Sequence, residues 1–522
     1  MTERFDVAVV GAGFAGSLLA MIARQLGLRV ILLERGRHPR VVIGESSTPL
    51  SNLLLEELAT RYGLAGIRPL SKWGSWRHSR PELACGLKRG FSFFHHAPGQ
   101  VEAIERAKQL LVAASPHDAI ADTHWYRADF DAYLAAEAQR LGVAYLDQVE
   151  LRDFADAGPE ARLLGTSNGR QIAISARLVV DATGPRGFLH RALRLGERPI
   201  PEMPATVALY SHFSGVNRLE ETGGIALEAE PPYPVDDAAV HHIFDGGWVW
   251  VLHFCNGVTS AGIAATDALA KELRLAEGEP AWERVLLRLP VLRSQFEGAK
   301  TVQPFRHLPR LAFRSAAVSG RTWALLPSAA GFADPLLSTG FPLTLLGVAR
   351  LAEVLEEDWG TERFAVRLEN YAEATDAELR AAARLIGALY ANFGNFPVFA
   401  AVSLLYFAAV SYAETARRLR RPGLAPSFLL HDHPHFGAEC AQVLERARSV
   451  HGDADSKRLI EDILKVIEPI DVAGLADRTR RNWYPVDAED LLRAAHKLGA
   501  SRDEVLQMLA RCGFSALAAA RS

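Results

Sequence analysis

Three glycines near the start of the chain constrain its fold more than any other feature. The apolar run at residues 5–10, Phe-Asp-Val-Ala-Val-Val, leads into Gly11, Gly13 and Gly16 in the spacing Gly-x-Gly-x-x-Gly. In a strand, turn and helix unit the first glycine permits the tight turn, the second lets the backbone approach a pyrophosphate, and the third lets the helix pack closely on its strand. The pattern therefore predicts a βαβ unit that binds a dinucleotide.

An acidic residue after the second apolar run narrows the choice of nucleotide. Residues 30–33 are Val-Ile-Leu-Leu, and Glu34 follows them. A carboxylate about 20 residues beyond the glycine turn accepts hydrogen bonds from ribose hydroxyls and repels a 2′-phosphate. We therefore expect FAD or NAD rather than NADP. The alternative is a tight turn in an unrelated α/β protein.

Length, charge and cysteine content set broad limits. A chain of 522 residues exceeds the roughly 250 to 300 residues of one hydrophobic core, so several lobes are expected. Its 58 basic and 61 acidic residues give a net charge of −3, which argues against binding to nucleic acid or to an anionic membrane. Four scattered cysteines favour reduced thiols, and no secretion signal precedes the first apolar run. These features favour a cytoplasmic protein.

Patterning along the chain predicts a mixed α/β fold with a Rossmann-like nucleotide-binding lobe, an inserted β-rich substrate lobe and a C-terminal helical region. We place the nucleotide lobe at residues 1–204, with an insertion around 65–120, and its return at 302–360; the β-rich lobe at 205–301; and the helical region at 361–522. The apolar segment 396–410 is shorter than the roughly 20 residues of a membrane-spanning helix, so we expect a buried helix and no stable membrane insertion.

Several motifs together resemble those of the FAD-dependent monooxygenase superfamily of the hydroxybenzoate hydroxylase type, and within it the flavin-dependent halogenases. They are the glycine triplet, Gly44-Glu-Ser-Ser-Thr-Pro49, Lys88, Arg127, Asp181-Ala-Thr-Gly184, Gly247-Trp-Val-Trp250 and Gly331-Phe-Ala-Asp334-Pro335. Over about the first 360 residues the chain is most similar to the phenolic halogenases, the phloroglucinol halogenases among them.

The resemblance implies FAD as the cofactor and assigns a set of residues to it. These are Gly11, Gly13, Phe14, Ala15, Gly16, Glu34, Arg35, Glu45, Ser46, Ser47, Arg127, Asp181, Ala182, Gly184, Ser328, Asp334 and Gly340. Pro327 and Ser328 replace the family's Gly-Asp pair, which leaves a weakly held flavin open. Because no second dinucleotide fingerprint is present, we expect a separate NAD(P)H-dependent flavin reductase to supply reduced FAD.

Lys88 matches the family's catalytic lysine. In the family, reduced flavin, O₂ and halide yield hypohalous acid, which travels inside the protein to the lysine. An ammonium can hydrogen-bond hypohalous acid and a neutral amine can form a haloamine, so this chemistry requires a partly desolvated lysine. Alternation along one extended run is expected to place Lys88, Gly90 and Ser92 on one face and Arg89, Phe91 and Phe93 on the other;.

Trp248 and Trp250 should share one face of their strand because side chains alternate with period two. In the family such tryptophans lie between flavin and lysine, and their bulk keeps the substrate away from the flavin, which disfavours hydroxylation. Two core aromatics are the plainer interpretation of the pair. The family's Ile-Pro after the second tryptophan is absent, since Val251-Leu252-His253 stands there.

The halide is expected at the start of a helix. Ser338, Thr339 and Gly340 precede an apolar helical pattern, and free backbone N–H groups at a helix N-terminus bind anions;. An ordinary N-cap explains the same residue types. Leu337 stands where tryptophan halogenases carry a glutamate that contacts the substrate, so free tryptophan is a poor candidate substrate. The resemblance to the phenolic halogenases implies another small, electron-rich aromatic, a phenol.

Other features leave several choices open. His241, His242 and Asp245 are candidates for the base that deprotonates a phenol, or plain polar residues of a strand and turn;. We assign no metal, since the His431-Asp-His-Pro-His435 tract lacks a second cluster;. The sequence leaves open whether the halide is chloride or bromide and whether the substrate is free or bound to a carrier protein. It also leaves open whether the protein forms a homodimer.

Two other functions compete with halogenation. A hydroxylase or another flavoprotein oxidoreductase of the same fold is suggested by the altered segment after Trp250. A catalytically idle flavin- or lipid-binding protein is suggested by Pro327-Ser328 and by the apolar segment 396–410.

Overall fold

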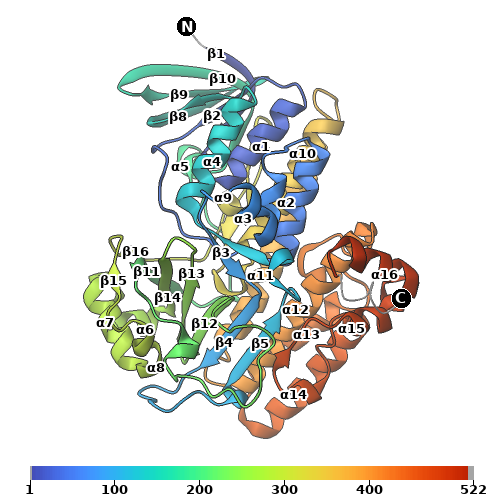
Figure 1. Ribbon diagram of the computed structural model, residues 1–522. Helices are drawn as coiled ribbons and strands as arrows, with labels where there is room; N and C mark the ends of the chain where they lie inside the picture. Colours follow the sequence, from blue (N-terminus) through green and yellow to red (C-terminus); the bar gives the residue numbers. More distant parts are fainter. Residues whose placement is uncertain (1–2, 515–522) are drawn as a thin grey trace.

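Two large β-sheets, two small two-stranded sheets and a group of long helices make up the structure (Figure 1). The computed structural model describes residues 3–514. The first sheet lies at the upper end in Figure 1, the second at the lower left, and the helices after residue 396 at the lower right. Helix α11 (Phe364–Tyr390) joins these parts, because it contacts α10 beside the first sheet and α12 and α13 in the last group.

The first sheet has parallel strands at its centre and an antiparallel extension. Its spatial order is β7-β2-β1-β10-β9-β8, with β18 also paired to β10. The strands are β1 (Glu3–Val10), β2 (Val30–Leu33), β7 (Ala144–Leu146), β8 (Val149–Ala157), β9 (Glu160–Ser167), β10 (Arg170–Asp181) and β18 (Trp323–Leu325). Val10 lies opposite both Leu33 and Asp181. The strand ends that carry the predicted nucleotide motifs therefore meet at one edge.

Helices cover this sheet because its central strands are apolar on both faces, as parallel strands usually are. The last four residues of β1 and all four of β2 are buried. Helix α1 (Phe14–Gln25), whose first ten residues are buried, packs against α4 (Arg127–Arg140) and α10 (Gly340–Glu357).

The second sheet is mostly antiparallel and has the order β15-β11-β14-β13-β12-β4-β5-β20. Its strands are β4 (Gly90–His95), β5 (Gln109–Ala113), β11 (Thr206–Ser214), β12 (Ala239–Phe244), β13 (Gly247–His253), β14 (Val258–Thr266), β15 (Lys300–Thr301), β16 (Arg306–Leu308), which pairs with β11, and β20 (Trp483–Tyr484). Helices α6 (Asp267–Glu272), α7 (Glu279–Arg288) and α8 (Pro290–Gln295) follow β14. Strands that are distant in sequence, before residue 114 and after residue 482, thus join the strands predicted at 205–301.

The expected continuous strand through Lys88 is wrong. Strand β3 (Cys85–Lys88) ends at Lys88 and pairs with β6 (Asp122–Trp125), whereas β4 begins at Gly90 in the second sheet. Between them, the Arg89 N–H donates to the carbonyl of Asp237 at 2.6 Å. The break turns the chain, so Lys88 Nζ lies 3.8 Å from the centroid of the Phe91 ring rather than on the opposite face.

The last part of the chain is mainly helical, as predicted. Its longer helices are α12 (Phe396–Arg418), α13 (Gly437–Ala447), α14 (Gly452–Ile467) and α16 (Arg502–Arg511), with the short α15 (Ala488–Arg493). Within residues 3–514, α12 alone is long and apolar enough to cross a membrane by length and composition, but 89% of its apolar stretch is buried. The prediction of a buried helix at residues 396–410 is confirmed.

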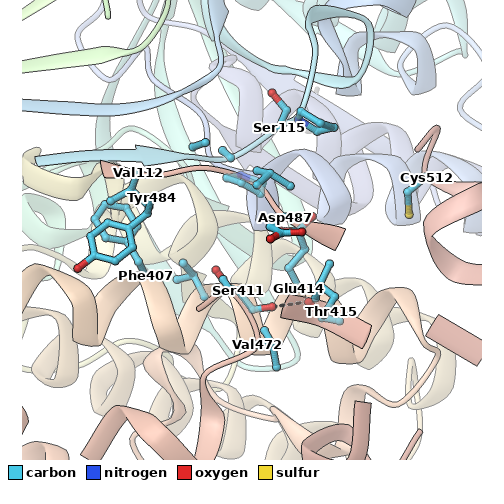
Figure 2. A pocket seen from close by; sticks show the side chains of 18 of the residues that line it. Val112, Ser115, Phe407, Ser411, Glu414, Thr415, Val472, Tyr484, Asp487 and Cys512 are labelled. Carbon is cyan, nitrogen blue, oxygen red and sulfur yellow. Dashed lines mark hydrogen bonds between the residues drawn. The ribbon is translucent and has the colours of Figure 1, made fainter. Parts of the chain in front are cut away.

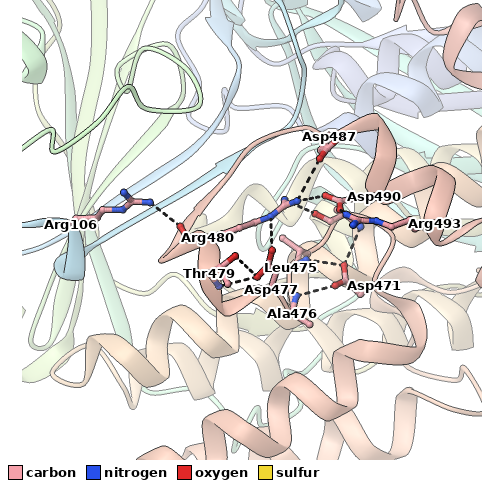
Figure 3. Close-up of polar contacts among 11 residues, drawn as sticks. Arg106, Asp471, Leu475, Ala476, Asp477, Thr479, Arg480, Asp487, Asp490 and Arg493 are labelled. Atoms are coloured by element: carbon pink, nitrogen blue, oxygen red, sulfur yellow. Dashed lines mark hydrogen bonds and ion pairs between the residues drawn. The ribbon is translucent and has the colours of Figure 1, made fainter. Parts of the chain in front are cut away.

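A segment after α14 returns to the second sheet as β20, which pairs in parallel with β5. Figure 3 shows the polar contacts that hold it. Asp490 is 5% exposed and accepts hydrogen bonds from Arg480 and Arg493. Arg106, next to β5, donates to the carbonyl of Arg480 at 3.0 Å. This returning segment was not predicted, because nothing local in its sequence indicates a partner strand more than 350 residues earlier.

Candidate functional site

The glycine turn lies at the edge of the first sheet, between β1 and α1. Gly11 has φ +105°, a left-handed conformation that favours glycine;. A Cβ on Gly16 would lie 2.0 Å from the carbonyl oxygen of Gly11, so only glycine lets α1 start this close to its strand. Helix α1 begins after Gly13 with no side-chain cap, and its first N–H groups are therefore available to an anion.

Two guanidinium groups stand beside this turn. The nearest Nη2 atoms of Arg127 and Arg40 lie 3.6 and 3.7 Å from the position that a Cβ on Gly13 would take. Arg127 is held by Asp131 at 2.7 Å in a buried ion pair. A helix N-terminus with two cations fits a pyrophosphate. Sequence reasoning passed over Arg40 and chose Arg35, which is exposed; the Arg-rich run at 35–40 was the available signal.

Glu34 is an ionised carboxylate at the same edge. It accepts hydrogen bonds from the N–H of Ala12 at 2.9 Å, the N–H of Gly36 at 2.8 Å and Arg40 at 3.1 Å. Burial alone would raise its pKa, but Arg40 and the two N–H groups outweigh burial and lower the pKa of Glu34;. An acid in this position fits a ribose and, together with the glycine turn, fits the adenosine diphosphate half of FAD.

The turn after β10 completes this edge. The Asp181 carboxylate accepts hydrogen bonds from Thr183 N–H at 2.8 Å and from the N–H of Leu189, and the carbonyl of Ala182 is 2.7 Å from the place of a Cβ on Gly11. Gly184 has φ +81°. Asp181 therefore shapes the turn, and the backbone of Ala182 lies against the glycine motif.

Residues 44–47 connect the nucleotide edge to the lysine. Arg127 donates to the carbonyl of Gly44 at 2.8 Å. Glu45 Oε1 is 2.8 Å from His212 Nε2, and Ser47 Oγ donates to the carbonyl of Thr123 at 2.7 Å. The side chains of Glu45 and Ser47, assigned to the cofactor from the sequence, thus contact His212 of β11 and Thr123 of β6 (Asp122–Trp125).

Lys88 is fully buried and has polar partners on one side. Its Nζ donates to Ser46 Oγ at 2.8 Å and to the carbonyl of Ser47, and it lies over the ring of Phe91. Asp122 is its direct partner position on β6. Burial lowers the pKa of Lys88, and the Asp122 carboxylate opposes that shift;. The amine is therefore easier to deprotonate than an ordinary lysine.

The two tryptophans pack together on one face of β13, as predicted. Their ring centroids are 5.6 Å apart, and both side chains are buried. Trp248 Nε1 donates to Asp334 Oδ1 at 3.2 Å, while Trp250 Nε1 donates to Ser260 Oγ at 3.3 Å. His241 lies 5.2 Å from the Trp248 ring, and burial together with Lys88 lowers the pKa of His241 to about 3.

The loop before α10 combines a buried acid with an unusual backbone. Asp334 is fully buried and accepts hydrogen bonds from Trp248, Tyr390 and the N–H of Leu336. Burial raises its pKa to about 7, which those hydrogen bonds limit;. Leu337 and Ser338 are both left-handed, with φ +61° and +55°. Such conformations cost about 1 kcal/mol or more per residue outside glycine and concentrate at functional sites.

The predicted halide residues form the start of α10. Gly340 is its first residue, and Thr339 occupies the N-cap without a side-chain hydrogen bond. Thr339 is buried and Ser338 half-buried. Ser328 lies in the short helix α9 (Pro327–Ala330). This helix is far from the glycine turn in sequence, but it follows β18, which belongs to the first sheet together with β1.

Phe91 and Asp122, which adjoin Lys88, line a cavity of about 150 Å³ that Lys88 itself does not line. Figure 2 shows side chains from α12 and from the returning segment facing it. Its lining comes from the β4–β5 hairpin, from Asp122, from α12 and from residues 472–491 and 508–514. A cavity of this volume accommodates one benzene-sized ring. Sequence reasoning did not predict the C-terminal part of this lining, since the C-terminal helices carry no recognisable motif.

Residues 6–251 match the family described as FAD dependent oxidoreductase. The protein is an FAD-dependent enzyme, and its relatives are flavin-dependent halogenases. Tetracycline 7-halogenase of Kitasatospora aureofaciens is 29% identical over 78% of this chain and 73% of its own length. Monodechloroaminopyrrolnitrin halogenase PrnC of Pseudomonas fluorescens is 27% identical over 91% and 84%.

Similarity to solved structures covers nearly the whole chain. Halogenase PltM, solved in complex with phloroglucinol and FAD, gives a TM-score of 0.80 at 22% identity over 91% of this chain and 99% of PltM. The mixed α/β fold with a Rossmann-like FAD-binding part and a C-terminal helical region is therefore confirmed. The resemblance, placed at about the first 360 residues from sequence alone, extends into the C-terminal helices.

Proposed function

We propose that the protein is a flavin-dependent halogenase that transfers oxidised halogen through Lys88 to a small, electron-rich, phenolic aromatic. The observation that carries the proposal is a fully buried lysine beside a ring-sized cavity, on a chain whose relatives are halogenases. A structural lysine is costly to bury, since its charge loses water. Such a residue in a cleft is a candidate for catalysis.

FAD would be held by the N-terminus of α1, by Arg40 and Arg127, and by Glu34. When bound and reduced, FAD supplies the electrons with which O₂ and halide yield hypohalous acid. The N–H groups at Thr339 and Gly340 are our candidates for holding the halide, because α10 begins there without a side-chain cap;. We infer that a separate NAD(P)H-dependent flavin reductase supplies the reduced flavin.

Lys88 would hold hypohalous acid by hydrogen bonding to its oxygen. Ser46 Oγ and the carbonyl of Ser47 fix the amine in place from one side. As an ammonium, Lys88 would withdraw electrons from the halogen–oxygen bond, which makes the halogen more electrophilic. The lowered pKa of Lys88 makes the proton available to the departing hydroxide;.

Trp248 and Trp250 would separate the aromatic substrate from the flavin. Their packed indoles are fixed by Asp334 and Ser260, so the barrier is rigid. A small hypohalous acid passes where an aromatic ring does not. This separation favours halogenation over direct hydroxylation of the ring.

The test measures product from phenols with a flavin reductase, NADH, O₂ and bromide. We expect brominated product that depends on bromide. Lys88→Gln, which keeps the length and polarity of the side chain, should lose at least about 100-fold in rate, as for loss of a general acid, while FAD binding persists. Lys271→Gln, an exposed lysine on α6, is the matched control. Full turnover in Lys88→Gln would overturn the lysine mechanism, and oxygenated product without bromide dependence would select a hydroxylase.

A further inference from the structure

Asp122 is a buried carboxylate with one oxygen in use and one oxygen free. Only 6% of Asp122 is exposed, and its Oδ1 accepts a hydrogen bond from Asn52 Nδ2 at 2.9 Å. Oδ2 is buried and has no hydrogen-bond partner among the described residues. A buried oxygen anion without a donor costs on the order of 1–3 kcal/mol or more. Such a group requires an explanation, and a ligand that brings a donor supplies one.

A ligand in the cavity of about 150 Å³ would bring the missing hydrogen-bond donor. Asp122 lines it together with Phe91, and both residues adjoin Lys88. Directly paired positions on antiparallel strands have Cβ atoms about 5 Å apart. An aromatic ring in the cavity therefore meets the Asp122 carboxylate directly, whereas Lys88 does not line the cavity and lies next to Phe91 and Asp122.

We propose that Asp122 is a further catalytic residue, which accepts the hydroxyl proton of a phenolic substrate while Asn52 holds the carboxylate in position. The proposal rests on the proposed function and names the substrate-activating base of the same site.

The charges around Asp122 come from two packed elements. Lys88 faces it from β3, and Tyr406, Glu414 and Arg418 face it from α12, where Glu414 and Arg418 form an ion pair at 2.7 Å. Burial raises the pKa of Asp122, Glu414 raises it further, and Lys88, Asn52 and Arg418 oppose the shift;. A carboxyl with a raised pKa is a stronger base than an ordinary aspartate, and this matches proton transfer from a phenol.

The candidates named from the sequence are placed less well for this task. His241, His242 and Asp245 do not line the cavity. Burial lowers the pKa of His242 to about 4 and, with Lys88, that of His241 to about 3. His242 Nδ1 is also engaged with His96 Nε2 at 2.8 Å. Both histidines are therefore weak bases with structural partners.

The proposed step balances as follows. The phenol O–H proton passes to Asp122, the ring carbon forms a bond to the halogen, and the halogen–oxygen bond of hypohalous acid breaks. The departing hydroxide takes a proton from the Lys88 ammonium and becomes water. The proton on the halogenated carbon then passes to the Lys88 amine, and Asp122 returns its proton to the oxygen. The net reaction converts phenol and hypohalous acid to halophenol and water, and both side chains regain their starting states.

The first test compares Asp122→Asn with Asp118→Asn. The asparagine keeps the shape and the contact with Asn52 but is no base. Asp118 is an exposed carboxylate that pairs with Arg89 and does not line the cavity, so its loss should change the rate little. We expect Asp122→Asn to halogenate phenols at least about 100-fold more slowly and to lose the fall in rate at acidic pH that protonation of Asp122 causes. A wild-type rate and an unchanged acid limb would overturn the proposal.

A binding measurement separates this inference from the proposed function. 4-Nitrophenol is a chromophore whose neutral and ionised forms absorb differently, and it needs no flavin chemistry. We expect it to bind the wild type as the neutral phenol, because a carboxylate acceptor disfavours a second anion. In Asp122→Asn we expect at least about tenfold weaker binding, equivalent to about 1.4 kcal/mol, and a larger ionised fraction. Identical affinity and spectrum would contradict the role of Asp122.

Oxidised halide, measured with an added thioether trap, completes the design. If wild type makes no oxidised halide and no halogenated product, the proposed function fails, whereas the nitrophenol result still decides the case for Asp122. If Asp122→Asn does not fold, Asn52→Ser takes its place. We expect this variant to shift the acid limb and to weaken nitrophenol binding, and no change in either would contradict the positioning role of Asn52.

Discussion

The nucleotide edge differs in construction from the region that holds Lys88 and the adjoining cavity. The nucleotide edge depends on a glycine turn, a helix start and an acid within residues 11–34, with Arg40 close behind. Lys88 and the adjoining cavity draw on residues 46–47, 88–91, 122, 406–418 and 472–491. A local motif makes the first site, and long-range packing makes the second. The first can therefore be recognised in sequence, whereas the second depends on the whole fold.

The largest effect should come from filling the glycine turn. In Gly16→Ala the new Cβ would lie 2.0 Å from the carbonyl oxygen of Gly11, and overpacking of this kind costs typically 1–3 kcal/mol or more. We expect FAD affinity to fall about 100-fold, equivalent to about 2.7 kcal/mol, as α1 moves away from β1. Flavin fluorescence titration measures the affinity.

Gly423→Ala is the control for that variant, because a Cβ at Gly423 meets no atom within 4 Å. Equal FAD affinities in the two variants would show that the glycine turn does not form the cofactor site.

A smaller effect is expected when the returning segment is loosened. Asp490→Ala removes the carboxylate from Arg480, which is 12% exposed, and from the exposed Arg493. Loss of a fully buried ion-pair partner costs 3–5 kcal/mol, so for this partly exposed network we expect about 2 kcal/mol. Amide exchange around β20 should then speed up about 30-fold, and phenol affinity should fall while FAD affinity is kept.

Asp462→Asn, on the surface of α14, is the control and should change exchange by less than about threefold;. A parallel loss of FAD affinity in Asp490→Ala would mean that the two regions are not separate.

The smallest expected effect is a difference in pH dependence between halogenation activity and FAD affinity. Activity requires the Lys88 ammonium and the Asp122 carboxylate together. Burial lowers the pKa of Lys88, so activity should fall with rising pH well before the value of about 10.4 for an ordinary lysine;. Burial raises the pKa of Asp122, so activity should fall with decreasing pH well above the ordinary value of about 3.9;.

We therefore expect a bell-shaped pH profile for the rate of phenol halogenation. It should be narrower than an ordinary lysine and an ordinary aspartate would give, and its two apparent pKa values belong to the coupled pair. FAD affinity should stay flat over the same range, because Glu34 has a lowered pKa and remains ionised. A flat rate profile, or a bell that FAD affinity follows, would contradict this assignment.

Sequence reasoning predicted the parts of the molecule that local rules control. The glycine turn, Glu34 and the tryptophan strand follow from spacing and alternation, and the structure has them in place. The break at Arg89 did not follow, because two different sheets capture the residues on either side of it. Arg40 and Asp131 were missed although their partners Glu34 and Arg127 are near in sequence. Asp122 was missed because its partner Asn52 lies 70 residues earlier in the chain. Likewise, β20 and α12 form the cavity through tertiary packing alone.

The central claim is that Lys88 passes oxidised halogen to the aromatic ring. A single turnover with reduced FAD, bromide, a phenol and a thioether trap measures how much oxidised bromide reaches the phenol and how much escapes. In the wild type, we expect most of it on the phenol. In Lys88→Gln, we expect nearly all of it on the trap, with the total unchanged, and an unchanged division between phenol and trap in this variant would contradict the account.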